Sequence, residues 1–179
     1  MAGLTASGES KRSDDYPSSE RFAALFLDRD GVINVNHGYV HKSENFDFID
    51  DIFEVARKAF ANHYKLVVIT NQAGIGRGYY SEQQFQKLTK WMCREFLNVG
   101  APIQKVYFSP FHPMAGLGVY KKDDISRKPR PGMILQAKQE LNLDLENSVL
   151  IGDKPSDIQA GIAAGVDDEQ VPQSPDWYK

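Results

Sequence analysis

Short, mostly apolar runs alternate with longer segments in which apolar residues recur every three or four positions. The short runs are rich in Val, Ile, Leu and Phe, and polar residues bound each of them. Such runs are typical of strands buried on both faces of a sheet. We therefore predict four buried strands, at residues 23–27, 65–70, 103–108 and 148–151.

The longer segments show the periodicity of amphipathic helices. Ser81 and Gln84 have the spacing of a capping box, which favours a helix start there. Pro131 suits the first turn of a helix, and Gly165 suits a helix end. The pattern predicts helices at residues 51–63, 81–98, 131–142 and 156–164.

Strands that alternate with helices indicate an α/β fold. We expect a three-layer, Rossmann-like parallel sheet with helices on both faces. Ligands of such sheets bind outside the carboxyl ends of the strands. In this sequence those ends carry Asp28, Thr70, Asn71, the loop after Phe108, and Asp153.

The length of 179 residues suits one domain. We place this domain at residues 21–166. Residues 1–20 are rich in Ser, Gly, Asp and Lys without periodicity and are expected to form a disordered leader. Residues 167–179 show no strand pattern and are expected to form an irregular tail.

Composition narrows the class of protein. The 21 Lys+Arg against 24 Asp+Glu give a net charge of -3, which argues against a nucleic-acid binder. One cysteine, Cys93, excludes an intramolecular disulfide and fits a reducing compartment. No apolar run reaches the roughly 20 residues that span a bilayer. We therefore expect a cytoplasmic monomer with neither a nucleic-acid nor a membrane partner.

Four polar blocks follow the predicted strands. Asp28 and Asp30 alone would fit an Asx turn with an acidic helix cap, but three further blocks accompany them. The blocks are residues 28–41 (DRDGVINVNHGYVH), 70–78 (TNQAGIGRG), 127–133 (RKPRPGM) and 151–157 (IGDKPSD). Together they resemble the haloacid dehalogenase superfamily of aspartate-nucleophile phosphatases, and within it the D-glycero-D-manno-heptose 1,7-bisphosphate and histidinol-phosphate phosphatases. The resemblance covers about residues 22–165.

The resemblance implies a reaction through an aspartyl-phosphate. Asp28 would be the nucleophile, and Asp30 would be the general acid and then the general base. Mg²⁺, which prefers oxygen ligands, would be held by Asp28, Asp153 and the backbone carbonyl of Asp30. We expect Asp157 to act as a helix-terminal or outer acid rather than as a direct ligand.

The remaining site residues are also implied by the resemblance. Thr70 and Lys128 would stabilise the transferring phosphoryl group and count as catalytic. Arg127 suits a second phosphate or a sugar hydroxyl. The expected substrate-binding residues are Asn36, His37, Gly38, Tyr39, Asn71, Gln72, Ala73, Arg127 and Lys154.

The chain departs from the family at a structural zinc site. Many members carry a C-x-H and a C-x-C pair in the loop after the third strand. The corresponding residues here are Ser109, Phe111, Asp124 and Ser126. Because zinc needs mostly Cys and His ligands, we expect no zinc, and a loop ordered by its own packing.

We expect a Mg²⁺-dependent phosphatase acting on a small phosphorylated sugar. The first substrate hypothesis is D-glycero-D-manno-heptose 1,7-bisphosphate, losing its 7-phosphate, in nucleotide-heptose or lipopolysaccharide precursor biosynthesis. Histidinol phosphate or another small sugar phosphate is the alternative. A catalytically silent phosphate-binding module belongs to a different class. No large insertion separates Asp30 from Thr70, so only a minimal cap is expected.

Overall fold

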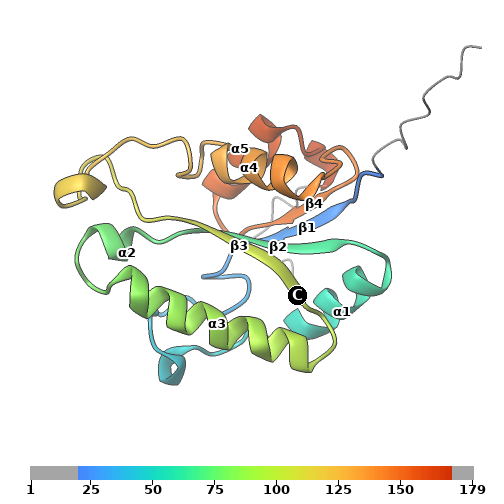
Figure 1. Cartoon of the computed structure of the whole chain (residues 1–179), viewed down its shortest axis with the longest axis horizontal. Helices are drawn as coiled ribbons and strands as arrows, with labels where there is room; N and C mark the ends of the chain where they lie inside the picture. The colour runs from blue at the N-terminus through green and yellow to red at the C-terminus, as the bar shows by residue number, and fades with distance from the viewer. Residues whose placement is uncertain (1–19, 171–179) are drawn as a thin grey trace, which may run out of the picture.

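The computed structural model describes residues 20–170, in which a four-stranded parallel sheet lies between two layers of helices (Figure 1). The strand order is β3-β2-β1-β4. This arrangement confirms the predicted fold class, and all four strands form where the apolar runs predicted them. They are β1 (Ala24–Leu27), β2 (Lys65–Asn71), β3 (Ile103–Ser109) and β4 (Val149–Ile151).

Two helices cover each face of the sheet (Figure 1). On one side lie α1 (Ile52–Ala61) and α3 (Glu82–Asn98), and on the other lie α4 (Gly132–Leu141) and α5 (Pro155–Ala164). These agree with the predicted helices to within a few residues. The patterns did not predict the short helix α2 (Ala73–Gly76) or the 3-10 turns η1 (Ser43–Asn45), η2 (Gly118–Tyr120) and η3 (Asp168–Gln170).

The core explains why β1 and the central positions of β2 are apolar on both faces of the sheet. Phe26 and Val67 belong to the hydrophobic cluster beneath α4 and α5. Leu27 and Val68, their neighbours in sequence, belong to the cluster on the side of α1 and α3. Since successive strand side chains point to opposite faces, a sheet covered twice needs apolar residues throughout.

Helix ends follow local chemistry. Ser81 Oγ accepts from the Gln84 amide at 3.1 Å, and Gln84 Oε1 accepts from the Ser81 amide at 2.8 Å, which confirms the predicted capping box. Gly165 ends α5 at φ +98°, a conformation in which a side chain would be strained.

None of the helices within residues 20–170 combines the length and the apolar character of a bilayer span.

A small flap replaces an inserted cap domain. Residues 33–35 pair with residues 47–49 through Val35 N to Asp47 O (2.8 Å) and Ile49 N to Ile33 O (3.0 Å). The pairing closes a loop of residues 36–46, which we call the flap. This short loop agrees with the minimal cap that was expected.

The predicted terminal segments are only partly described. The leader lies outside the described residues apart from Glu20. The tail is described as far as Gln170, where η3 forms.

Candidate active site

The turn after β1 brings Asp28 to the carboxyl edge of the sheet. The Arg29 carbonyl accepts the amides of Val32, Ile33 and Asn34, which folds the chain back on itself. Gly31 lies at φ +97°, and a Cβ there would collide with the carboxylate of Asp153. The glycine therefore lets the segments after β1 and β4 approach closely.

Lys128 sits at the centre of a buried charge cluster. Its ammonium nitrogen lies 2.9 Å from Asp28 Oδ1, 2.7 Å from Asp157 Oδ1 and 3.0 Å from the Ile69 carbonyl. An ammonium has three protons, and each has an acceptor. Burial opposes its charge, but Asp28 and Asp157 outweigh this and hold the pKa of Lys128 above its usual value.

Burial raises the pKa of Asp28 to about 6. The Lys128 charge opposes this rise, and the nearby Asp157 adds to it. A nucleophilic carboxylate must be ionised, so the pocket favours a further cation beside Asp28.

Three carboxylates fit that requirement. Oxygen atoms of Asp28, Asp153 and Asp157 lie within 4.8 Å of one another. Asp153 Oδ1 is buried and has no hydrogen-bond partner within the described part of the chain. Oxygen donors of this kind suit Mg²⁺. Asp28 and Asp157 are both paired with Lys128, so the cluster offers three candidate carboxylates, and ligation by Asp28 and Asp153 stays a prediction.

The carboxylate of Asp30 lies apart from this cluster. Its Oδ1 accepts from the Arg29 guanidinium at 2.8 Å and from the Asn34 amide at 3.2 Å. Its Oδ2 accepts from Gln72 Nε2 at 3.1 Å. The predicted metal contact of Asp30 concerns its backbone carbonyl, and both this contact and the predicted role of the carboxyl as general acid and base stay predictions.

Thr70 and Asn71 end β2 at the same edge. Thr70 Oγ1 accepts from Gln72 Nε2 at 2.8 Å. The Asn71 side chain donates to the Lys128 carbonyl (3.0 Å) and accepts from the Lys128 amide (3.1 Å). Asn71 therefore clamps the loop that carries the buried lysine, a role that the sequence did not suggest.

A cleft of about 540 Å³ is lined by Asn71, whereas Thr70, Asp28 and Asp153 are not among its lining residues. Most of the predicted binding residues line it, together with Asp30 and Lys128; they are Asn36, Gly38, Tyr39, Asn71, Gln72, Ala73, Arg127 and Lys154. His37 is not among the lining residues, and its Nε2 lies 2.7 Å from Asp47 Oδ2 on the exposed side of the flap. Its substrate role stays a prediction that this geometry does not favour.

The lining includes residues that the sequence analysis did not single out, among them Arg77, Tyr80 and His112. Arg77 and Arg127 form no ion pair within residues 20–170. Burial, and then the charge of Arg77, lowers the pKa of Arg127. Two uncompensated guanidinium groups in one cleft favour an anionic ligand. The sequence signal that could have indicated Arg77 was its place as the basic residue within the polar block TNQAGIGRG.

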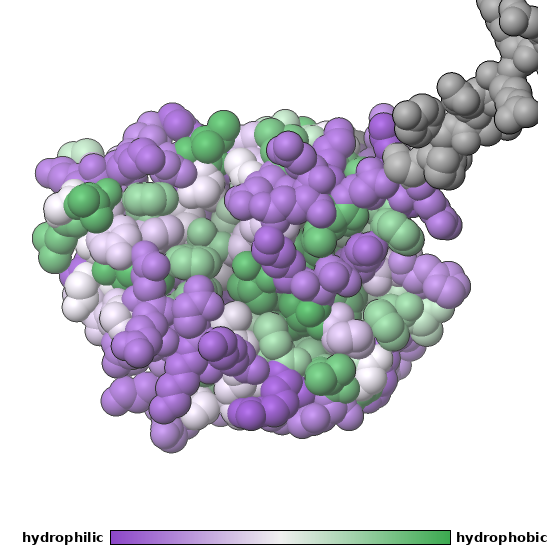
Figure 2. Space-filling view, viewed as in Figure 1, coloured by the Kyte–Doolittle hydropathy of each residue, from purple (hydrophilic) through white to green (hydrophobic). Residues whose placement is uncertain are grey.

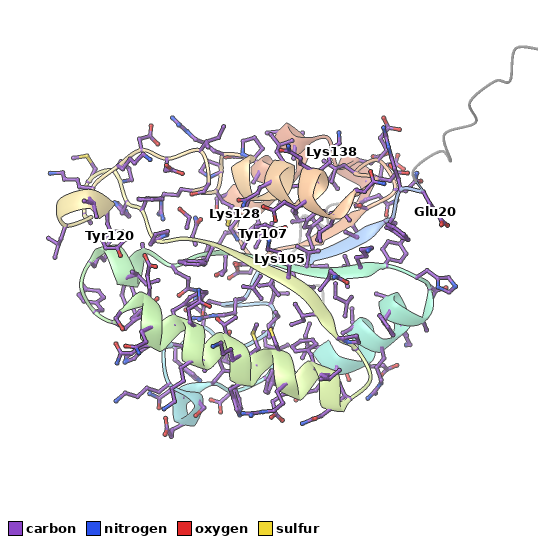
Figure 3. All side chains as sticks on the ribbon, in the orientation of Figure 1. Glu20, Lys105, Tyr107, Tyr120, Lys128 and Lys138 are labelled. Carbon is purple, nitrogen blue, oxygen red and sulfur yellow. The ribbon has the colours of Figure 1, made fainter. Side chains whose placement is uncertain are left out.

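Hydrogen bonds join parts of the loop between β3 and α4. Ser126 Oγ donates to the buried Ser109 Oγ at 3.0 Å; the resemblance places both residues at positions of zinc ligands, and the absence of zinc stays a prediction. Tyr120 OH donates to Glu82 Oε1 at 2.8 Å and joins the loop to α3 (Figure 3). The tip is apolar (Figure 2), with Met114 78% and Val119 82% exposed.

Comparisons with known proteins agree with this geometry. Residues 22–169 match the family model described as polynucleotide kinase 3 phosphatase. The D-glycero-alpha-D-manno-heptose-1,7-bisphosphate 7-phosphatase of Burkholderia mallei is 59% identical over 143 residues, which are 80% of this chain and 76% of that protein. The corresponding beta-anomer phosphatase of Vibrio cholerae is 49% identical, with 80% and 77% covered.

Solved structures show the same similarity. A HAD-like phosphatase from Mesorhizobium loti is 36% identical with a TM-score of 0.77, covering 81% of this chain and 69% of that one. The D,D-heptose 1,7-bisphosphate phosphatase of B. bronchiseptica, complexed with magnesium and phosphate, is 26% identical with a TM-score of 0.69, covering 80% and 76%.

Proposed function

We propose that this chain removes the 7-phosphate of D-glycero-D-manno-heptose 1,7-bisphosphate. The chain belongs to the polynucleotide kinase 3 phosphatase family, and within the haloacid dehalogenase superfamily to the D-glycero-D-manno-heptose-1,7-bisphosphate 7-phosphatases. Its reaction is the Mg²⁺-dependent hydrolysis of a phosphomonoester through an aspartyl-phosphate. The product would supply heptose 1-phosphate for nucleotide-heptose and lipopolysaccharide precursor synthesis.

The site residues divide the reaction into two steps. Asp28 attacks phosphorus, the bond to the sugar oxygen breaks, and Asp30 gives its proton to that oxygen. Asp30 then takes a proton from a water molecule whose oxygen attacks the aspartyl-phosphate, and Asp28 is restored. Lys128 and Thr70 offset charge on the transferring group. Mg²⁺ bound by Asp28, Asp153 and the Asp30 carbonyl would neutralise phosphoryl oxygens in both steps.

Two arginines in the cleft, Arg77 and Arg127, support a bisphosphate as the substrate. Arg77 and Arg127 line the cleft that also holds Asp30 and Lys128. A bisphosphate has a second phosphate for these guanidinium groups, and its size suits a cleft of about 540 Å³. We therefore assign Arg77 and Arg127 to the phosphate that is not removed.

Histidinol phosphate is the alternative substrate within the same chemistry. Its amine is cationic, so two unpaired arginines would repel it instead of binding it. The alternative that is not an enzyme is a phosphate-binding module without catalytic activity. It would not need Asp30, which the fold holds by both carboxylate oxygens.

A phosphate-release panel tests the substrate. It compares the alpha and beta anomers of heptose 1,7-bisphosphate, because the relatives named above differ in anomer, with histidinol phosphate, fructose 1,6-bisphosphate and a 3′-phosphorylated oligonucleotide. We expect the highest kcat/KM for a heptose bisphosphate, with heptose 1-phosphate as the product in ³¹P NMR.

Two variants test the chemistry. Asp28→Asn should abolish release, and the matched surface change Asp144→Asn should leave it unchanged. A higher kcat/KM for histidinol phosphate, or release that survives Asp28→Asn, would overturn the proposal.

We also propose that the protein is a cytoplasmic monomer. The single cysteine, Cys93, supports a reducing compartment. Light scattering coupled to size-exclusion chromatography should give the mass of one chain, 20.2 kDa.

A further inference from the structure

The Gln72 side chain is bonded at both ends of its amide. Its nitrogen donates to Asp30 Oδ2 at 3.1 Å and to Thr70 Oγ1 at 2.8 Å. Its oxygen accepts from Tyr80 OH at 2.6 Å. The amide therefore connects a buried tyrosine to the general acid that the proposed function requires.

The direction of these bonds depends on Tyr80. A glutamine amide can turn by 180°, which would exchange its oxygen and nitrogen. Turned in that way, the amide would lose the two bonds that its nitrogen donates, and the Tyr80 hydroxyl would face an NH2 group instead of an acceptor. The Tyr80 hydroxyl favours the observed orientation because it offers a proton to the oxygen. Burial raises the pKa of Tyr80 to about 12, so this proton is retained.

The Tyr80 ring is itself held firmly. It is 5% exposed, and the His41 ring of the flap stacks on it at 5.0 Å with 7° between the planes. Gly74 lies so close that a Cβ there would collide with the ring. These contacts hold the ring in the position from which its hydroxyl reaches Gln72 Oε1.

We propose that Tyr80 is a positioning residue of the phosphatase reaction: its hydroxyl orients the Gln72 amide, and that amide holds Asp30 where it protonates the leaving sugar oxygen. Tyr80 acts through Gln72 and takes no part in bond making. The assignment rests on the proposed function, because a general acid matters only for a leaving group that needs a proton.

The test compares two leaving groups. A sugar alkoxide needs the proton of Asp30, whereas p-nitrophenolate leaves without one. The ratio kcat/KM reports phosphoryl transfer to the enzyme when that is the first irreversible step. Tyr80→Phe removes one hydrogen bond and should lower kcat/KM for heptose bisphosphate about fivefold through kcat, with KM within about twofold. For p-nitrophenyl phosphate, kcat/KM should stay within about twofold.

Tyr107→Phe is the matched control. Tyr107 is also 5% exposed, and its hydroxyl donates to Glu140 Oε2 at 2.7 Å on the side of α4 (Figure 3). This change deletes the hydrogen-bonded hydroxyl of a tyrosine with the same exposed fraction, and that hydroxyl bonds to Glu140 and not to Gln72. Both substrates should be turned over by this variant as by the wild type.

A double-mutant cycle with Gln72→Ala tests whether the effect of Tyr80 on Asp30 passes through the Gln72 amide. In the Gln72→Ala background, Tyr80→Phe should cause no further loss, since the amide that transmits its effect is gone. Additive losses, or an equal loss on both leaving groups, would overturn the proposal. If the wild type hydrolyses other alkyl phosphates but not heptose bisphosphate, the substrate assignment fails alone, and the same comparison on the accepted alkyl phosphate decides the role of Tyr80.

Discussion

The Lys128 ammonium nitrogen lies 2.7 Å from Asp157 Oδ1, closer than the 2.9 Å that separates it from Asp28 Oδ1. Both Lys128 and Asp157 are buried. Asp157 Oδ2 also accepts from the Lys154 amide at 3.0 Å, at the start of α5. One carboxylate thus holds the active-site lysine and the first turn of the helix after Asp153.

Removal of Asp157 should destabilise the fold. Asp157→Ala leaves the buried Lys128 with Asp28 as a carboxylate partner but removes a hydrogen bond between charged groups, which costs about 1.5–3 kcal/mol. We predict a decrease of that size in the free energy of unfolding, measured by urea denaturation. Asp123→Ala breaks an exposed pair with Arg130 and should cost less than about 1 kcal/mol. Equal losses in the two variants would contradict the prediction.

Arg77 should determine the preference for two phosphates. Arg77→Gln removes a charge-assisted contact to the retained phosphate, so we predict that KM for heptose 1,7-bisphosphate rises at least about tenfold. KM for heptose 7-phosphate, which lacks that phosphate, should change by less than about twofold. Arg130→Gln, at an exposed arginine paired with Asp123, serves as the control. An equal rise for both substrates would exclude a selective role of Arg77.

Activity should depend on Mg²⁺ and not on zinc. Dialysis against EDTA should abolish turnover, and Mg²⁺ alone should restore it, because oxygen ligands form the carboxylate cluster. Metal analysis of the purified protein should find no stoichiometric zinc, since Ser109, Phe111, Asp124 and Ser126 offer no Cys or His. Recovery of activity that required zinc would show that a different ligand set exists.

Glu140 should make stability depend on acid pH. The Lys105 ammonium, together with Gln136 and Tyr107, lowers the pKa of Glu140 to about 2 (Figure 3). A carboxyl with a depressed folded-state pKa stabilises the fold above its unfolded value, near 4.5, and loses this contribution as pH falls towards 2. Glu140→Gln should therefore lower Tm at pH 7, and the difference should shrink between pH 4.5 and 2. A difference that is constant over this range would contradict the assignment.

Most of the fold was predictable because its signals are local. The runs that became β1 and the centre of β2 are apolar at successive positions, since α1 and α3 cover one face of the sheet and α4 and α5 the other. The Ser81–Gln84 capping box needs only neighbouring residues. The short helix α2 was missed because four residues with two glycines carry no helical periodicity.

The sequence motifs predicted which residues come together at the edge of the sheet. Asp28, Asp153 and Lys128, from distant blocks, do meet at one edge of the sheet. The partners of these groups were not predictable, because they depend on distances between segments. Asp157 proved to be the closest carboxylate to Lys128, and Asn71 proved to clamp the Lys128 backbone.

The order of short apolar and amphipathic runs determined the layers of the fold, because burial on both faces of a parallel sheet requires that pattern. The motif blocks determined the chemistry, because strand ends meet at one edge. Only the tertiary structure decided how each polar group is used. It placed Arg77 and Arg127 in the cleft, with no carboxylate of residues 20–170 paired to either, and it brought Tyr80 to Gln72. Hydrogen bonds and charge pairs act over a few ångströms, and those distances exist only after the chain has folded.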